Sequence, residues 1–253
     1  MRRLEGKVAI ITGAGRGIGR GLATLYAKEG AKIVAISLIV EEAEDLASEL
    51  NARHGGSTAL GFGCDVGREA EIRASVDRAV DRFGTVDIAV NNAFELASAQ
   101  SSVLELTREK LDRQMLTGPH AALTMMQAVY PHMEGRDGRI LNFASSAGII
   151  GMTGMTPYAM AKEAIRALTR TAAREWGDKR ITVNAICPAA LTASVKAAID
   201  GGFANVQLGP IARFGDIDED IAPIALFLVS PEARYVTGAT YMADGGASID
   251  AGR

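Results

Sequence analysis

The 253-residue sequence contains only two cysteines, Cys64 and Cys187, which lie far apart and form no C-x-x-C pair. Neither a disulfide framework nor a sulfur-ligated metal is indicated, and we expect reduced thiols in the core of a cytoplasmic protein. The three histidines, His54, His120 and His132, show no metal-ligand spacing such as H-E-x-x-H. We therefore expect a protein without a bound metal.

The sequence also lacks an excess of positive charge and any long hydrophobic run. Lysine and arginine total 27 against 30 aspartate and glutamate residues, a net charge of −3. We therefore expect neither nucleic acid nor a membrane surface as a partner. No apolar stretch reaches the roughly 18 residues that a membrane-spanning helix requires. With 48% hydrophobic and 23% charged residues, the composition is typical of one globular domain, here residues 1–253.

Short β-branched apolar runs alternate with longer segments of helical periodicity. Strands are predicted at residues 7–12, 32–38, 57–64, 86–90, 139–143, 182–186 and 240–242. Helices are predicted at residues 17–29, 41–53, 68–83, 104–133, 157–176 and 218–228. Helices between the strands impose crossover connections, so we expect an α/β fold: a doubly wound, seven-stranded parallel sheet with helices on both faces.

Two irregular features are expected within this pattern. Gly118-Pro119 should bend the helical region at 104–133, because proline lacks a backbone donor and clashes with the preceding turn. The Ala- and Gly-rich stretch at 189–209 is interpreted as a loop.

The first predicted strand-to-helix turn reads TGAGRGIG from Thr12 to Gly19. The bare amides of such a turn and the positive end of the following helix can receive a pyrophosphate. The spacing G-x-G-x-x-G fails in every register, whereas G-x-x-x-G-x-G fits at Gly13, Gly17 and Gly19. We predict a dinucleotide-binding cradle here; the alternative is a tight turn without a ligand.

The end of the second predicted strand bears on the choice between NAD and NADP. An acidic residue there would bind the ribose diol of NAD and repel a 2′-phosphate. Ser37 and Leu38 stand there instead, and Arg16 could add positive charge beside the cradle. The sequence therefore favours NADP over NAD; the alternative for Arg16 is a solvated side chain on the turn.

Tyr158 and Lys162 are four residues apart in the helix predicted at 157–176, so they share one face of it. Ser145 follows the strand predicted at 139–143 and should lie at the same edge of the sheet as the cradle. The plain alternative for these three is a packed tyrosine, a surface lysine and a capping serine.

Together these features make the chain resemble the short-chain dehydrogenase/reductase family over nearly its whole length, in both the spacing and the order of its motifs. The matching segments are TGAGRGIG at 12–19, CDV at 64–66, NNA at 91–93, Ser145 thirteen residues before Tyr158, YAMAK at 158–162, VNAICP at 183–188 and DGG at 244–246. The resemblance implies a Rossmann-type fold and a nicotinamide cofactor.

The resemblance also implies how the cofactor is bound. Asp65 and Val66 would flank the adenine, Asn91 and Ala93 would pass close to its ribose, and Thr192, in the segment after Pro188, would contact the nicotinamide amide. The complete set of expected cofactor-binding residues is Gly13, Arg16, Gly17, Ile18, Gly19, Ser37, Asp65, Val66, Asn91, Ala93, Tyr158, Lys162, Pro188 and Thr192. For the residues that only the resemblance assigns, the alternative is a strand-end or turn residue.

The mechanism that the resemblance implies is hydride transfer between a carbinol carbon and the nicotinamide, without a metal. Tyr158 would be the general acid/base, because the ammonium of Lys162 and a cationic nicotinamide favour its phenolate. Lys162 would also bind the nicotinamide ribose. Ser145 would hold the substrate oxygen as charge develops on it.

The chain departs from the family pattern in three places. Gly118 stands where many members carry an asparagine that supports a proton relay, so we expect protons to leave through another polar group or through water beside Gly118. Phe94 replaces the glycine of the usual NNAG segment, and Ala189 replaces that of the usual PG. Phe94, with Met152 and Met155, is a candidate for lining the substrate pocket, and ordinary core packing is the alternative for each.

The leading functional hypothesis is an NAD(P)-dependent oxidoreductase acting on a neutral, largely apolar secondary alcohol or ketone, with a substrate-binding loop at about 189–212. One alternative is a 3-oxoacyl thioester reductase. An alternative of another class is a nucleotide-binding protein without catalytic activity. The resemblance also implies a homodimer or homotetramer, built through the helices predicted at 104–133 and 157–176.

Overall fold

The computed structural model describes residues 2–200 and 208–249 and contains one seven-stranded sheet in the order β3-β2-β1-β4-β5-β6-β7. The strands are β1 (Val8–Thr12), β2 (Lys32–Ser37), β3 (Ala59–Gly63), β4 (Ile88–Asn91), β5 (Arg139–Phe143), β6 (Thr182–Pro188) and β7 (Thr240–Ala243). Every neighbouring pair is parallel. This confirms the expected doubly wound fold, with strand bounds within two residues of those predicted.

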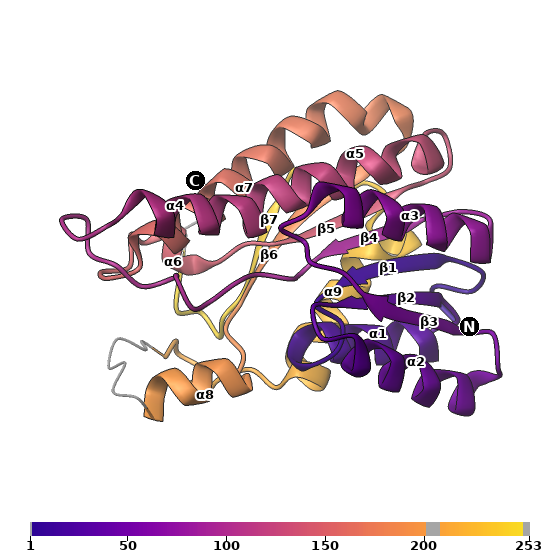
Figure 1. Ribbon diagram of the computed structural model, residues 1–253, viewed down its shortest axis with the longest axis horizontal. Coiled ribbons are helices and arrows are strands. Elements are labelled where there is room, and N and C mark those ends of the chain that lie inside the picture. Colours follow the sequence, from indigo (N-terminus) through magenta and orange to yellow (C-terminus); the bar gives the residue numbers. More distant parts are fainter. Residues whose placement is uncertain (1, 201–207, 250–253) are drawn as a thin grey trace.

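Helices cover both faces of the sheet (Figure 1). One face carries α1 (Gly17–Lys28), α2 (Val40–His54) and α9 (Ala222–Val229). The opposite face carries α3 (Glu69–Phe83), α4 (Arg108–Met115), α5 (Ala121–Met133) and α7 (Thr156–Trp176). The central strands are buried on both faces and are therefore almost continuously apolar, as in β1, where all five residues are buried.

The irregularity expected at Gly118-Pro119 is a π-helical turn, η1 (Leu116–His120), between α4 and α5. Pro119 cannot donate to the preceding turn, so the hydrogen-bond ladder shifts there. The predicted helix at 104–133 begins later than expected, at Arg108, because the Thr107 side chain accepts a hydrogen bond from the Lys110 amide and caps it.

The interpretation of 189–209 as a loop is wrong in part, because residues 193–200 form the helix α8 (Ala193–Asp200). Thr192 lies before this helix, and its hydroxyl accepts a hydrogen bond from the Val195 amide at 3.2 Å. Residues 201–207 of the expected substrate loop lie outside the described residues. The predicted helix at 218–228 consists of a second π-helical turn, η3 (Ile217–Ile221), followed by α9.

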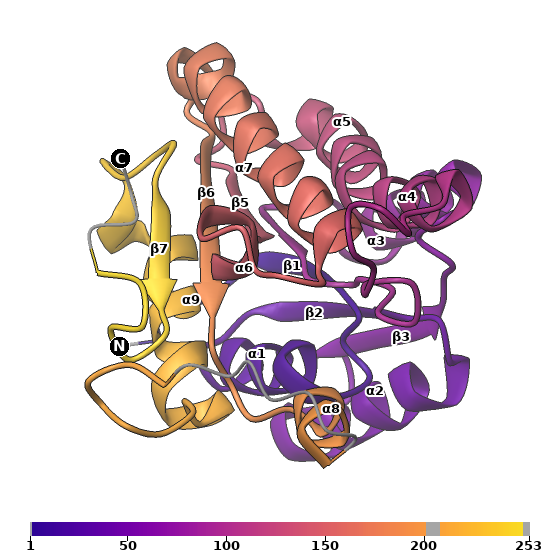
Figure 2. The same ribbon diagram turned by 90° about the vertical axis from the view of Figure 1, so that its left-hand side faces the viewer.

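The short elements complete the chain: α6 (Ser146–Ile149), η2 (Gly177–Lys179) and η4 (Pro231–Ala233). Figure 2 shows α6 next to the first turn of α7, with α8 beyond the carboxyl ends of β5 and β6. Within residues 2–200 and 208–249, no helix combines the length and the hydrophobicity needed to cross a membrane.

Candidate active site

The glycine-rich turn lies between β1 and the first residue of α1, where the strand order reverses. Gly17 opens α1 with a φ of +56°, a conformation that favours glycine. A Cβ atom at Gly19 would stand 2.2 Å from the Gly13 carbonyl oxygen, which leaves no room for any other residue. The turn therefore exposes backbone amides at a helix N-terminus, as a phosphate-binding cradle requires.

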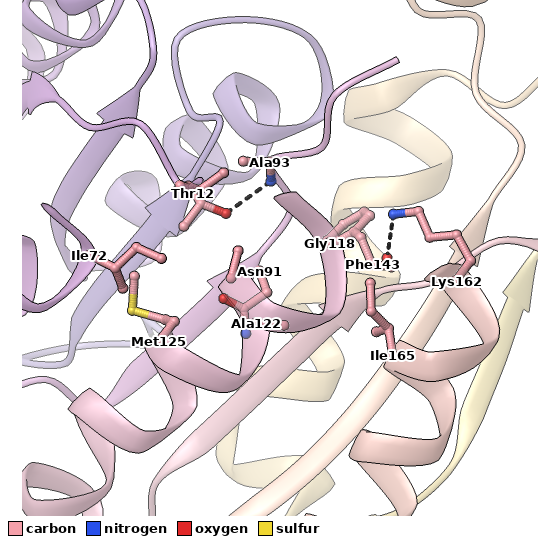
Figure 3. Close-up of a pocket in the computed structure, with 12 residues that line it drawn as sticks. Thr12, Ile72, Asn91, Ala93, Gly118, Ala122, Met125, Phe143, Lys162 and Ile165 are labelled. Atoms are coloured by element: carbon pink, nitrogen blue, oxygen red, sulfur yellow. Dashed lines mark hydrogen bonds between the residues drawn. The ribbon is translucent and has the colours of Figure 1, made fainter. Parts of the chain in front are cut away.

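Thr12 and Asn92 hold this turn against the end of β4. The Thr12 hydroxyl accepts hydrogen bonds from the amides of Asn92 and Ala93, both at 2.9 Å. Figure 3 shows the one from Ala93. The Asn92 side chain donates to the carbonyls of Thr12 at 2.9 Å and Gly13 at 3.2 Å. Thr12 and Asn92 were not among the residues predicted from the sequence, although both belong to the motifs TGAGRGIG and NNA.

Asn91, which was selected, has a different environment. Its side-chain amide donates to Asn142 of β5 at 2.8 Å, and Asn142 in turn donates to the buried hydroxyl of Thr169 in α7 at 2.9 Å. These contacts link β4, β5 and α7 beneath the site. Asn91 therefore has a structural role in addition to any contact with the cofactor.

A carboxylate that the sequence analysis did not identify lies at the end of β2. Glu42, in the first turn of α2, approaches Ser37, whose hydroxyl lies 3.3 Å from one Glu42 oxygen. Arg16 is 4.0 Å from the other oxygen. A Cβ atom at Gly15 would lie 2.7 Å from the Glu42 carboxylate, so this group stands directly beside the cradle. The contact depends on how α2 packs and could not be found by counting along β2.

The remaining expected cofactor residues follow the carboxyl ends of other strands. Asp65 comes two residues after β3, and its carboxylate accepts a hydrogen bond from the Gly67 amide at 2.8 Å. Val66 and Ala93 line a small cavity at the centre of the site. Pro188 is the last residue of β6. Because parallel strands end at one edge, these residues lie on the same side of the sheet as the cradle.

Ser145 and Tyr158 meet at this edge. Ser145 caps α6, and its hydroxyl accepts a hydrogen bond from the Ala147 amide at 3.2 Å. Tyr158 lies in the first turn of α7 and is half-buried. Burial raises the pKa of Tyr158, and a hydrogen bond with Ser145 partly offsets this increase. Ser145 is thus both a capping residue and the partner of Tyr158.

Lys162 is buried, with 4% of its surface exposed, and its amine donates a hydrogen bond to the Phe143 carbonyl oxygen at 2.8 Å (Figure 3). Burial lowers the pKa of Lys162 to about 7. The expectation that the Lys162 ammonium, together with a cationic nicotinamide, favours the phenolate of Tyr158 stays a prediction. Desolvation acts on both groups and favours the neutral phenol and the neutral amine.

Phe94 packs against this pair. Its ring contacts Tyr158 edge to face, with 5.2 Å between ring centroids and 83° between planes. The Lys162 nitrogen lies 3.9 Å from the centroid of the Phe94 ring. A Cβ atom at Gly118 would lie 2.5 Å from the same ring. The space left by the missing side chain at Gly118 is therefore partly filled by phenylalanine.

The cavity that remains beside Gly118 is also lined by Thr12, Asn91, Phe143 and Lys162. The space open to the centre of a water molecule there is about 10 Å³, close to the minimum that one water requires. The expected exit of protons through water beside Gly118 thus stays a prediction, limited to about one molecule.

Met152 and Met155 lie in the segment between α6 and α7, which joins Ser145 to Tyr158. Both side chains are half-buried. Met155 pairs with Ser101 in a short parallel bridge, which fixes the segment that follows β4 against the start of α7. Their place between two candidate catalytic residues is consistent with a substrate pocket, which remains a prediction.

The proteins that this chain resembles are dehydrogenases and reductases. A family model described as enoyl-(acyl carrier protein) reductase matches residues 13–248. The 12α-hydroxysteroid dehydrogenase of Clostridium sp. is 37% identical over 253 residues, covering 96% of each chain. The D-threitol dehydrogenase of Mycolicibacterium smegmatis is 38% identical, covering 98% of this chain and 95% of that protein. A 3-oxoacyl-[acyl-carrier-protein] reductase of Thermotoga maritima is 32% identical, covering 98% and 100%.

The chain belongs to the short-chain dehydrogenase/reductase family. It is an oxidoreductase that acts on CH–OH groups and interconverts secondary alcohols and ketones with a nicotinamide cofactor.

The replacement Gly19→Ala tests the cradle. The added methyl group meets the Gly13 carbonyl oxygen, so we expect dinucleotide affinity to fall about ten- to hundredfold. Calorimetric titration with the cofactor measures this loss. Gly56→Ala is the control, because a Cβ atom there meets nothing within 4 Å. Equal affinity of the Gly19 variant and the control would show that the turn is not the binding site.

The buried amine of Lys162 predicts a pH-dependent contribution to stability. Its pKa is about 7 in the folded chain, below the ordinary 10.5, so the unfolded state binds the extra proton between these values. The free energy of unfolding of the wild type, relative to Lys162→Met, should therefore rise from pH 7 to pH 9. Urea denaturation of both proteins at each pH measures the difference, and a constant difference would contradict the lowered pKa.

Proposed function

We propose that Tyr158, Ser145 and Lys162 are the catalytic residues of a dehydrogenase or reductase of neutral, largely apolar secondary alcohols and ketones. The observation that carries the proposal is that Tyr158 and the buried Lys162 lie one turn apart on α7, with the Lys162 nitrogen 5.5 Å from the centroid of the Tyr158 ring, at the sheet edge that also carries Ser145 and the glycine cradle. A nucleotide-binding protein without catalytic activity would have no need to bury a lysine beside a tyrosine.

The residues fit a dinucleotide. Gly13, Gly17 and Gly19 leave the amides at the start of α1 free of side chains, and Gly19 accepts no larger residue. When bound, the cofactor supplies or accepts the hydride. The chain has to hold the reacting carbon and move one proton at the substrate oxygen.

Tyr158 is suited to move that proton. Its raised pKa keeps the phenol protonated near neutral pH, so it can donate to the oxygen of a ketone as that oxygen gains negative charge. The Ser145 hydroxyl can donate to the same oxygen and stabilise the developing charge. In the direction of alcohol oxidation, Tyr158 must first lose its proton, which requires a positive charge nearby.

The apolar character of the substrate is supported by the side chains around Tyr158. Phe94 contacts its ring, and Met152 and Met155 occupy the segment before it. The likeness to a hydroxysteroid dehydrogenase agrees with such a pocket. The likeness to a 3-oxoacyl-[acyl-carrier-protein] reductase favours the alternative of a thioester substrate. A panel of cyclic ketones and β-keto thioesters, compared by kcat/KM, separates the two.

For the cofactor we propose NAD, in place of the NADP expected from the sequence. That expectation rested on the absence of a carboxylate at Ser37 and Leu38. The Glu42 carboxylate lies beside Ser37 and within 4.0 Å of Arg16. It can accept a hydrogen bond from a ribose hydroxyl, it would repel a 2′-phosphate, and it neutralises the cation that was expected to attract one.

We also propose a homodimer or homotetramer in the cytoplasm. Exposed leucines support the association of copies: Leu104 before α4 is 98% exposed, and Leu123 on α5 is 41% exposed. The cytoplasm is supported by the free thiols of Cys64 and Cys187, both buried. Light scattering on the purified chain measures the number of copies.

Replacement of the proton donor tests the catalytic assignment. Tyr158→Phe removes the hydroxyl and leaves the ring, so kcat should fall about 10³-fold or more while cofactor affinity changes little. Ser145→Ala should lower kcat about 10²-fold. The absorbance of the reduced nicotinamide, followed by stopped flow, measures both rates. A Tyr158→Phe enzyme with wild-type kcat would refute the proposed mechanism.

The Glu42→Gln variant tests the cofactor proposal. It removes the negative charge and keeps the shape, so affinity for NADP should rise about tenfold relative to NAD. Binding of 2′,5′-ADP and of 5′-ADP, measured by calorimetry, reports the same preference without catalysis. Glu44→Gln, two residues further along α2, is the control, because it removes the same charge from the same helix. If the wild type binds 2′,5′-ADP more tightly than 5′-ADP, the cofactor is NADP, as expected from the sequence.

A further inference from the structure

Two departures from the family pattern contact each other in the folded chain. Phe94 follows β4 and Gly118 lies in the π-helical turn η1, 24 positions later in the sequence. A Cβ atom at Gly118 would lie 2.5 Å from one ring carbon of Phe94 and 3.3 Å from two others. The Phe94 ring therefore leaves no room for a side chain at position 118. Phenylalanine at 94 and glycine at 118 fit together for this reason.

The Phe94 ring covers the amine of Lys162. Among residues 2–200 and 208–249, the hydrogen bond to the Phe143 carbonyl oxygen is the only one that this amine makes. The ring centroid lies 3.9 Å from the nitrogen, within the range of a cation–π contact. The aromatic face thus gives the buried amine a second partner where a polar side chain is missing.

The same ring contacts Tyr158 with its edge, at 5.2 Å between centroids. Tyr158 and Lys162 lie one turn apart on α7, so a single ring contacts both. The backbone beyond Phe94 is fixed as well: the buried side chain of Gln114 donates to the Glu95 carbonyl oxygen at 2.8 Å. The position of the ring is therefore set by α4 as well as by α7.

We propose that Phe94 is a positioning residue that holds Lys162 below Tyr158, and that Gly118 is the glycine that makes room for it. The inference rests on the proposed catalytic role of Tyr158 and Lys162. Phe94 acts through these two residues. It takes the place of the asparagine side chain that many family members carry at the position of Gly118. An aromatic ring at 94 and a glycine at 118 are required together.

Within the part of the chain that the structure describes, two other titratable groups lie near Lys162. Tyr158 lies on the same helix, and the Cys187 thiol faces it from β6. Burial raises the pKa of Cys187 to about 12, so the thiol stays neutral across the usual pH range of an assay. A change in the pH profile on replacement of Phe94 therefore reports on Tyr158 and Lys162.

The experiment compares three replacements of Phe94. Phe94→Leu keeps an apolar side chain without an aromatic face, Phe94→Tyr keeps the ring, and Phe94→Ala removes both. We expect Phe94→Leu and Phe94→Ala to lower kcat about tenfold, with little change in the KM of the cofactor. The apparent pKa in the kcat profile of Phe94→Leu should rise, because without the aromatic face the ammonium of Lys162 is less stable and favours the Tyr158 phenolate less. Phe94→Tyr should stay within about threefold of the wild type.

The pair is tested with Gly118→Asn, alone and combined with Phe94→Gly. Each single replacement should lower kcat, and the double variant should recover at least about tenfold over Gly118→Asn. A purely structural role would change thermal stability without moving the pH profile. Wild-type kcat and pH profile in Phe94→Leu, or multiplicative effects in the double variant, would overturn the proposal. An active Tyr158→Phe enzyme would instead refute the proposed function on which it rests.

Discussion

The parallel direction of all seven strands is the constraint on which the site depends. It brings the ends of β1, β4, β5 and β6 to one edge, where each strand is followed by a different part of the chemistry. The Thr12 hydroxyl joins the first two of these strand ends, since it accepts from the amides of Asn92 and Ala93. Together with the Asn92 side chain, which donates to the carbonyls of Thr12 and Gly13, this connection holds the glycine turn against the end of β4.

The two parts of the site differ in their exposure: the cradle is accessible, whereas the side chains of Tyr158 and Lys162 are shielded from solvent. At the cradle, glycine leaves backbone amides accessible, which suits an anionic group. At Tyr158 and Lys162, burial raises the pKa of the phenol and lowers that of the amine, so both favour their neutral forms. The hydrogen bond from Lys162 to the Phe143 carbonyl and the ring of Phe94 satisfy the amine in this low-dielectric environment. Desolvation thus opposes the charged forms of two groups that lie one helical turn apart, and it brings the pKa of Lys162 to about 7.

Much of the fold and the candidate site could be predicted from the sequence, because those features are local. Periodicity places the strands, and the spacing of Tyr158 and Lys162 follows from one helical turn. Glu42 could not be found, because its approach to Ser37 depends on the packing of α2. The contact of Phe94 with Gly118 joins distant segments, and the pKa of Lys162 depends on burial by several elements. The helix α8 was missed because the glycines that follow it, Gly201, Gly202 and Gly209, favoured a loop over the whole stretch at 189–209.

The most direct test follows the hydrogen itself. The purified enzyme is incubated with a ketone and a reduced cofactor that carries deuterium at C4 of the nicotinamide, and the alcohol is analysed by mass spectrometry. The account predicts one deuterium on the carbinol carbon, delivered to one face. An enzyme that binds the cofactor at the glycine turn but forms no deuterated alcohol from any ketone or β-keto thioester would contradict it.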